Sequence, residues 1–253
     1  MKWHYWAGAL LLYAAFLVAT APASLLFQAA NRYFSPATIT AESTEGTLWH
    51  GGAQGVVLTA RDRQALRLGR ASWSLNPLWL LSGKLSADLM LAGDDIKGHG
   101  KLILGPHSLG FRQASLSVPA AALSYVDPRL DMWPLEGRLD IRSNEFLLQP
   151  NRYQGNGEIT WEQAGTALVK INPIGSYRAT FSGTGKAIHV QLETQTGALE
   201  LSGKGNWSQT AGFVFDGRAK AREHEAELRH LLDLVGKPNQ DNSYALTLDV
   251  KSP

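Results

Sequence analysis

The sequence predicts a mainly β protein in which a single N-terminal transmembrane helix precedes a curved antiparallel β-sheet body built from two similar repeats, each ending with a short helix. Three observations support this fold class. An uncharged apolar stretch lies within residues 1–31, and short alternating segments bounded by turn residues fill the rest of the 253-residue chain. Several motifs of the first half of that body also recur, in the same order, in the second half.

Residues 1–31 have the composition of a membrane anchor. Between Lys2 and Arg32 there is no Asp, Glu, Lys or Arg, and residues 3–27 are about long enough to cross a bilayer as one helix. Lys2 carries the nearby positive charge, which places the N-terminus in the cytoplasm and residues 32–253 across the membrane. The predicted anchor residues are Trp3, Trp6, Leu10, Leu11, Leu12, Phe16, Leu17 and Val18.

A cleaved signal peptide is the alternative interpretation of this segment. Residues 6–18 could form its apolar core, and the small residues at 19–21 or 21–23 resemble a cleavage site. Pro22 directly follows the first site and lies inside the second, and the apolar run continues to Phe27. We therefore favour the anchor, and both interpretations export the remainder of the chain.

The exported body shows the pattern of strands and tight turns. Apolar residues recur at every second position, which is expected when one face of a sheet is covered and the other is wet. The clearest predicted strands are residues 55–60, 65–68, 84–91 and 187–193. Glycines separate many of these segments, as expected for antiparallel meanders.

Two short helices are predicted within the body. Residues 222–235 contain an apolar stripe with helical period, and Gly236 and Pro238 are placed to end that helix. The stripe consists of Leu228, Leu231, Leu232 and Val235. The second candidate is residues 119–126, where Pro119 would occupy the first helical position.

The body contains a candidate internal repeat, with units at about 38–141 and about 150–250. Trp49 with its following glycines parallels Trp161, and the Asn76-Pro77 dipeptide parallels Asn172-Pro173. A short helix and a terminal strand close each half. Because the matches occur in one order, we expect two similar sheet units that pair or stack edge to edge.

No catalytic, metal-binding or cofactor-binding set can be built from the sequence, so we predict that the protein is not an enzyme and has no cofactor. Cysteine is absent, which excludes disulfides, thiol redox centres and Cys nucleophiles. The helical pair His224 and His230 is six residues apart and does not share a helix face. A net charge of +2 with scattered basic residues argues against nucleic-acid binding.

Three Gly-rich segments resemble functional loops without matching them. Residues 105–110 resemble a nucleophile elbow, but the spacing before the serine and the strand-to-helix context are wrong. Residues 182–186 and 202–205 resemble phosphate loops, but both lack the Walker spacing. We predict hairpin turns for all three.

The candidate contact residues lie in two places. The run from Pro77 to Leu81 is apolar on all sides, so burial against lipid, a partner or the protein's own core is expected. A small basic cluster nearby could meet anionic headgroups. The predicted contact residues are Trp79, Leu80, Leu81, Arg61, Arg63 and Arg67.

Taken in order along the chain, these features resemble a known family. The quoted motifs are Gly-Thr-Leu-Trp-His-Gly at 46–51, Trp-x-x-Asn-Pro-Leu at 73–78, Asn-Pro-Ile-Gly-x-Tyr at 172–177, and the leucine-rich helix followed by Tyr-x-Leu-x-Leu at 244–248. Together they resemble protein N of the bacterial type II secretion system, with a more distant similarity to AsmA-like envelope proteins. Ile174 stands where we would expect leucine.

The resemblance implies a non-enzymatic, single-pass inner-membrane protein of Gram-negative bacteria with a periplasmic body. Its expected role is accessory, through protein–protein contact with other subunits that export folded periplasmic proteins across the outer membrane. The AsmA-like similarity implies an alternative function in envelope lipid binding or lipid transfer. That alternative requires a continuous apolar trough that is open to solvent.

Overall fold

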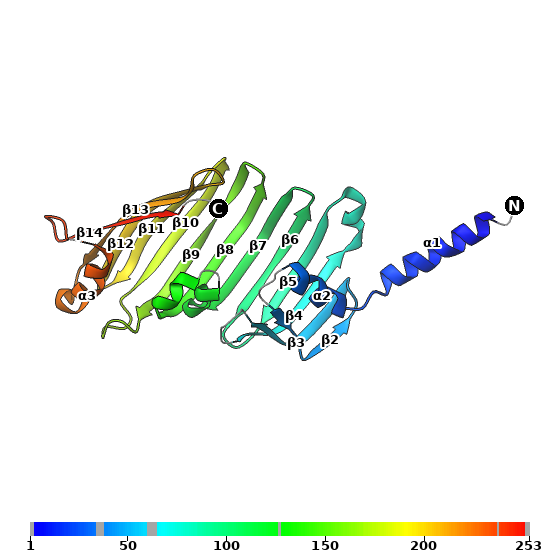
Figure 1. Cartoon of the computed structure of the whole chain (residues 1–253), viewed down its shortest axis with the longest axis horizontal. Helices are drawn as coiled ribbons and strands as arrows, with labels where there is room; N and C mark the ends of the chain where they lie inside the picture. The colour runs from blue at the N-terminus through cyan, green and yellow to red at the C-terminus, as the bar shows by residue number, and fades with distance from the viewer. Residues whose placement is uncertain (1–2, 34–37, 60–64, 126–127, 237, 251–253) are drawn as a thin grey trace. The chain divides into compact units, whose positions relative to one another are not determined.

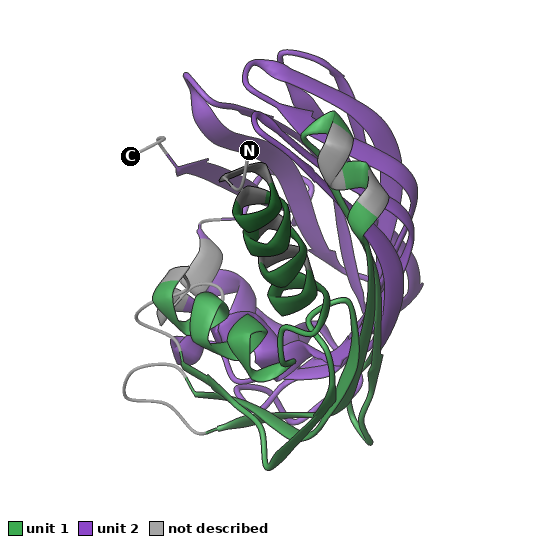
Figure 2. Ribbon diagram, turned by 90° about the vertical axis from the view of Figure 1, so that its right-hand side faces the viewer, with its two compact units in different colours: residues 1–97 green, residues 98–253 purple. Residues whose placement is uncertain are grey.

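The computed structural model describes residues 3–33, 38–59, 65–125, 128–236 and 238–250. The chain is mainly β, and the fourteen strands of its described residues belong to one open antiparallel sheet (Figure 1). Contacts divide the chain into two compact units, Met1–Lys97 and Gly98–Pro253 (Figure 2). The predicted antiparallel, mainly β fold is confirmed.

The apolar N-terminal segment forms two helices instead of one. Helix α1 covers Trp3–Ala19 and helix α2 covers Ser24–Tyr33. Pro22 lies between them, where its missing N–H and its effect on the preceding residue oppose a continuous helix. It forms an antiparallel bridge with Thr47 instead, so the prediction of one helix over residues 3–27 is wrong.

A search of the described helices for membrane spans gives a negative result. Among residues 3–33, 38–59, 65–125, 128–236 and 238–250, no helix is both long enough and apolar enough to cross a membrane.

Unit 1 contains a small antiparallel sheet with strands β1 and β2 at its edge. Both pair with β3, and they use the side of β3 that β4 leaves free. The strands are β1 (Thr38–Thr40), β2 (Ser43–Gly46), β3 (His50–Thr59), β4 (Leu66–Asn76) and β5 (Leu85–Ala92), and the 3-10 helix η1 (Pro77–Ser82) joins β4 to β5. The predicted strands at 55–60, 65–68 and 84–91 are confirmed within β3, β4 and β5.

Helix α2 packs on this sheet through aromatic contacts. The ring of Phe27 lies edge-on to the buried ring of Trp73, with 6.1 Å between the centroids. Trp73 also donates from Nε1 to the carbonyl oxygen of Leu48 at 3.1 Å. The Asn31 side chain bonds to both backbone polar groups of Ile39, which ties α2 to β1.

Unit 2 is a meander in which each strand pairs with the next one along the chain. Its strands are β6 (Lys97–Gly105), β7 (Ser108–Pro119), β8 (Leu135–Gln149), β9 (Arg152–Thr166), β10 (Gly175–Gly185), β11 (Ile188–Gly197), β12 (Leu199–Ser208), β13 (Gly212–Ala221) and β14 (Tyr244–Val250). The 3-10 helices η2 (Ala120–Tyr125) and η3 (Pro128–Met132) lie between β7 and β8. Helix α3 (Glu225–Val235) lies between β13 and β14.

Helix α3 confirms the helix predicted at residues 222–235, although it begins three residues later. His224 precedes it with a left-handed φ of 56° and makes no side-chain cap. The Gly236 N–H closes the last turn on the Leu232 carbonyl oxygen at 3.2 Å, as the sequence predicts. Three leucines of the predicted stripe are buried, namely Leu228, Leu231 and Leu232.

Two local predictions are wrong. In place of the α-helix predicted at residues 119–126, Pro119 ends β7 and Ala120–Tyr125 forms the 3-10 helix η2, while residue 126 lies outside the described residues. Residues 202–205, expected in a turn, lie inside β12. Their glycines are explained by the Phe213 and Phe215 rings, which occupy the space where Cβ atoms of Gly205 and Gly203 would stand.

The turn predicted at 105–110 is confirmed, because residues 106–107 join β6 to β7. Of the turn predicted at 182–186, residues 182–185 belong to β10 and only Lys186 lies in the β10–β11 turn. The two sequence repeats stay a prediction, since the division at Lys97 and Gly98 follows spatial contacts and not sequence similarity.

Candidate functional site

The sheet of unit 2 has one apolar and one polar face. Cross-strand partners from β7 to β11 form one row, which is Leu116, Ile141, Ile159, Ala179 and Leu192. The neighbouring row is Ser117, Asp140, Thr160, Arg178 and Glu193. Because successive side chains of a strand point to opposite faces, these rows define the apolar face and the polar face of unit 2.

Helix α3 covers the apolar face at one end of unit 2. Its leucines form a buried cluster with Tyr177 of β10, Leu199 of β12 and Tyr244 of β14. The Tyr177 hydroxyl donates to the Leu199 carbonyl oxygen at 3.0 Å, and burial raises the pKa of Tyr177 well above its ordinary value of 10.0. This end of the face is a closed core.

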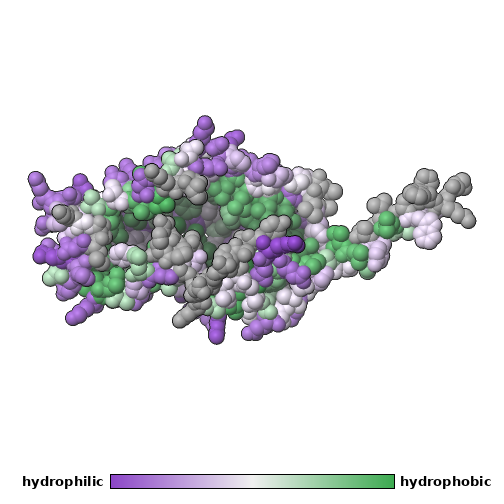
Figure 3. Space-filling model, viewed as in Figure 1, coloured by the Kyte–Doolittle hydropathy of each residue, from purple (hydrophilic) through white to green (hydrophobic). Residues whose placement is uncertain are grey.

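Toward the other end, aromatic rings lie over glycines and form an aromatic floor. Phe146 contacts Phe181 and Tyr153 contacts Trp207, with ring centroids 5.4 and 5.1 Å apart. A Cβ atom on Gly217 would lie 2.7 Å from the Phe215 ring, so only glycine leaves room for this ring. The floor consists of Phe146, Tyr153, Phe181, Trp207, Phe213 and Phe215, and Figure 3 shows apolar side chains around a hollow over the strands of unit 2.

The turns at the floor end of the strands carry basic charge. Arg152 begins β9 after the β8–β9 turn, and Lys186 occupies the β10–β11 turn. Both side chains are exposed. The apolar floor is therefore bordered by cations, an arrangement that suits an apolar molecule with an anionic head.

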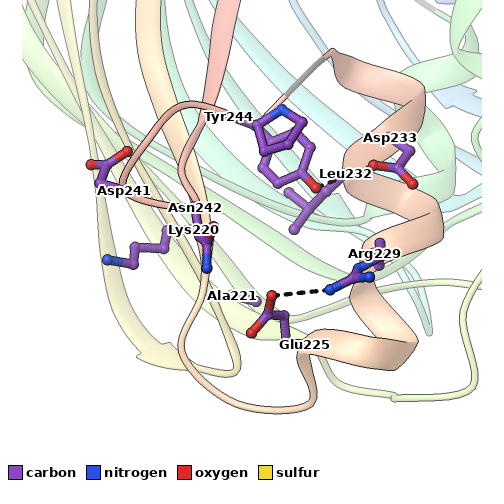
Figure 4. Close-up of a pocket in the computed structure, with 10 residues that line it drawn as sticks. Lys220, Ala221, Glu225, Arg229, Leu232, Asp233, Asp241, Asn242 and Tyr244 are labelled. Carbon is purple, nitrogen blue, oxygen red and sulfur yellow. Dashed lines mark hydrogen bonds and ion pairs between the residues drawn. The ribbon is translucent and has the colours of Figure 1, made fainter.

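A polar pocket of about 430 Å³ lies beside α3 (Figure 4). The Tyr244 hydroxyl donates to Asp233 at 3.1 Å, and Arg229 pairs with Glu225 at 3.4 Å. Desolvation, with a smaller effect of Asp233, raises the pKa of Tyr244. The lining residues are Lys220, Ala221, Glu225, Arg229, Leu232, Asp233, Pro238, Asp241, Asn242 and Tyr244.

The loop before β14 borders this pocket and is fixed by Asp241. Its carboxylate accepts from the Ser243 hydroxyl at 2.6 Å and from the Ser243 N–H at 3.2 Å, and these bonds lower the pKa of Asp241. Arg218 lies 3.8 Å from the same carboxylate. These interactions hold the loop onto the sheet.

The predicted anchor residues lie on α1, which contains no charged side chain. Trp3 and Leu11 belong to α1, but their side chains lie outside the described part of the chain. The other six are exposed, from 51% for Leu17 to 77% for Trp6. Helix α1 therefore exposes apolar side chains along its length.

The C-terminal end of α1 is held by the turn between β2 and β3. Trp49 donates from Nε1 to the Val18 carbonyl oxygen at 2.8 Å, and the Leu48 N–H donates to the Ala21 carbonyl oxygen at 2.7 Å. The carbonyl oxygen of Trp49 accepts from the Leu75 N–H at 2.6 Å. The end of α1 and the end of β4 therefore meet at Trp49.

Helix η1 follows β4 at this same end and contains the predicted contact residues Trp79, Leu80 and Leu81. The Trp79 side chain is 37% exposed, and its carbonyl oxygen accepts from the Ser82 hydroxyl at 2.7 Å and the Lys84 N–H at 3.1 Å. The side chains of Leu80 and Leu81 lie outside the described part of the chain. Trp79 is thus presented on a hydrogen-bonded turn.

Of the predicted basic contacts, Arg67 is not brought together with Trp79. Arg61 and Arg63 lie outside the described residues, and Arg67 is exposed near the start of β4. Strand β4 separates Arg67 from η1 by about 30 Å, at roughly 3.3 Å per residue. Arg67 and Trp79 thus lie at opposite ends of one strand.

The two edges of the sheet differ in how well they are protected from pairing with another chain. Strands β1 and β2 have three and four residues, and most of their side chains are polar. Strand β14 has seven residues that pair consecutively with β13, and Pro238 bridges to Tyr244 at its start. Within the described part of the chain, residues 245–250 have no strand on their outer side.

The histidines do not form a reactive or metal-binding group within the described residues. His189 contacts Asn206 on the polar face, and His224 lies 3.7 Å from Glu227 across one turn of α3. A search of the described chain finds no group of three or more potential metal ligands.

Sequence reasoning singled out Trp79 and the anchor, but it missed the aromatic floor. The signal was present as aromatic residues two positions from glycines, as in Phe213, Phe215 and Gly217. The glycines at 203 and 205 were predicted to lie in a turn, although a glycine in a strand interior often marks a close approach by another group.

The described residues define a mainly β protein with an open antiparallel sheet, whose unit 2 part has an apolar and a polar face. The family model of type II secretion system (T2SS), protein N, matches residues 37–247, so the chain belongs to this family and the resemblance seen in its motifs is confirmed. Comparisons with curated proteins and with solved structures give no match. The similarity to AsmA-like proteins stays a prediction.

Proposed function

We propose that the protein is a non-enzymatic accessory component of the type II secretion system that lies in the inner membrane and acts by contact with other subunits. The family match over residues 37–247 is the observation that carries this proposal. Membership of the family indicates involvement in type II secretion. The subunit contact and the membrane location are our own extensions.

Helix α1 supports the proposed membrane location. Its uncharged surface and exposed apolar side chains would be costly in water, since burying a large apolar side chain is worth about 1.5 to 3 kcal/mol. In this proposal α1 is the anchor, the N-terminus is cytoplasmic and the sheet is periplasmic. Cleavage of the segment as a signal peptide is the alternative.

The outer side of β14 is the surface that we propose for subunit contact. An unpaired strand edge offers a row of backbone donors and acceptors to an incoming extended segment. Apolar side chains at alternate positions would add specificity, and Leu248 is already 50% exposed. The short, polar edge at β1 and β2 is less suited to this mode of binding.

Gene deletion tests the proposed role in secretion. The deletion strain should retain secreted enzymes in its periplasm, and the full chain supplied in trans should restore them to the medium. A variant with Thr247→Pro in β14 should restore less secretion than the unchanged chain, because proline removes a backbone donor from the strand. Ser202→Ala on the polar face is the matched control, and unchanged secretion in the deletion strain would contradict the proposal.

The apolar face of unit 2 favours a second function in lipid binding. Its aromatic floor could hold acyl chains, and Arg152 and Lys186 at the floor end could bind an anionic headgroup. Val190→Glu places a charge on the apolar face of β11, and Gln191→Glu places the same charge on the exposed polar face. The amount of phospholipid that copurifies with the full chain should fall in Val190→Glu and stay unchanged in Gln191→Glu. An equal amount in both variants, or none with the unchanged chain, would reject this function.

A further inference from the structure

We infer that η1 and the turn at Trp49 form a membrane-contact surface of unit 1, which enters the headgroup layer of the bilayer that holds α1. The inference rests on the proposed membrane anchoring and deepens it, because it adds a second lipid contact and a fixed orientation of the unit 1 sheet. The occupant of this surface is the phospholipid bilayer itself.

The first step is the short connection between α1 and the sheet. Helix α1 ends at Ala19, and Ala21 already accepts a backbone hydrogen bond from Leu48. Pro22 then bridges to Thr47. Because the polar layer on each side of a bilayer is only about 5 to 7 Å deep, an anchor without a linker brings this end of the sheet to the headgroups.

The second step places η1 at the same end. Trp49 bonds through its indole to Val18 of α1 and through its carbonyl oxygen to Leu75 of β4. Helix η1 begins two residues after Leu75, at Pro77. One residue, Trp49, therefore connects the end of the anchor to the strand that leads into η1, through its side chain on one side and its backbone on the other.

The third step is the length of α1. Its 17 residues span about 25 Å at roughly 1.5 Å per residue, whereas a hydrocarbon core is about 30 Å thick. A short anchor is accommodated by local thinning of the bilayer and by flanking residues that reach the interface. Thinning brings the headgroup layer toward η1, which lies at the C-terminal end of α1.

The fourth step is the chemistry of η1. The helix has the sequence Pro-Leu-Trp-Leu-Leu-Ser and carries no charge. Tryptophan favours the membrane–water interface, and the Trp79 side chain is partly exposed. Exposed Lys84 lies two residues after η1, and its backbone N–H donates to the carbonyl oxygen of Trp79. A cation that can bind lipid phosphates therefore lies next to η1.

Fluorescence quenching tests the inference on the full chain in vesicles of phosphatidylethanolamine and phosphatidylglycerol. Because the chain lacks cysteine, a single Ser82→Cys, Phe16→Cys or Ser202→Cys variant can each carry one environment-sensitive label. Position 16 reports on α1, position 82 on η1, and position 202 on β12 of unit 2. Labels at 16 and 82 should be quenched by lipid-borne nitroxide, and the label at 202 by aqueous iodide.

The outcomes separate this inference from the anchor. Lipid quenching at position 16 with only iodide quenching at position 82 would overturn the contact of η1 and leave the anchor in place. Iodide quenching at both positions would overturn the anchor and the inference together.

A variant of Trp49 tests the fixed orientation. Trp49→Phe retains an aromatic ring but removes the N–H that binds the Val18 carbonyl oxygen. Lipid quenching should fall at position 82 and stay unchanged at position 16. Unchanged quenching at position 82 would show that this hydrogen bond does not orient the sheet.

Discussion

Helices α3 and η1 are both short elements attached to strand ends, but their apolar side chains lie in different surroundings. Leu228 of α3 is fully buried on the strands of unit 2, as part of a cluster with Tyr177 and Tyr244. Trp79 of η1 is partly exposed beside the end of α1. The comparison teaches that the α3 leucines belong to the protein's own core, whereas the Trp79 side chain is left partly exposed.

Removing a leucine from α3 should have the largest effect on folding. Leu228→Ala leaves a cavity in the closed core, which typically costs about 2 to 5 kcal/mol of unfolding free energy. Leu248→Ala is the matched control, because Leu248 is half exposed and should lose less than about 1.5 kcal/mol. Denaturant unfolding followed by tryptophan fluorescence measures both, and equal losses would contradict the assigned core.

Removing the Tyr177 hydroxyl should have an intermediate effect. Tyr177→Phe leaves the buried Leu199 carbonyl oxygen without this donor, at a cost of about 1 to 3 kcal/mol near neutral pH.

The same variant should change the pH dependence of stability. Because the folded state raises the pKa of Tyr177, the unfolded chain releases this proton first. The contribution is fully present below pH 10.0 and declines as the pH rises above it. Tyr177→Phe should lack this alkaline decline, and identical slopes above pH 10.0 in both proteins would contradict the prediction.

Removing the exposed ring of η1 should have the smallest effect on folding. Trp79→Ser should change the unfolding free energy by no more than about 0.5 kcal/mol, as expected for a surface substitution. Lipid quenching of the label at position 82 should nevertheless fall relative to the protein that retains Trp79, because the ring no longer holds η1 in the headgroup layer. A loss of stability comparable to that of Leu228→Ala would place Trp79 in the core and remove the contrast.

The sequence was sufficient for features that depend on local periodicity. The stripe containing Leu228, Leu231 and Leu232 correctly located α3, because a helix that packs on a sheet needs one apolar side. Alternation likewise located β5 and β11. In the same way, Gly236 marked the end of α3, where its N–H closes the last turn on Leu232.

Tertiary contacts explain what the sequence alone did not predict. Pro22 breaks the N-terminal helix and pairs with Thr47, a partner 25 residues away in the chain. The link between Val18 and Leu75 depends on Trp49, and no periodicity reveals it. The floor glycines could not be separated from turn glycines until strand pairing placed aromatic rings above them.

Photo-crosslinking in secreting cells tests most directly whether the protein acts by contact. A photoreactive residue at Thr247 probes the β14 edge, one at Trp79 probes η1, and one at Ser202 is the polar-face control. The account predicts a protein adduct from position 247, lipid adducts from position 79 and little of either from position 202. A yield of protein adduct from position 247 that does not exceed the yield from position 202 would contradict it.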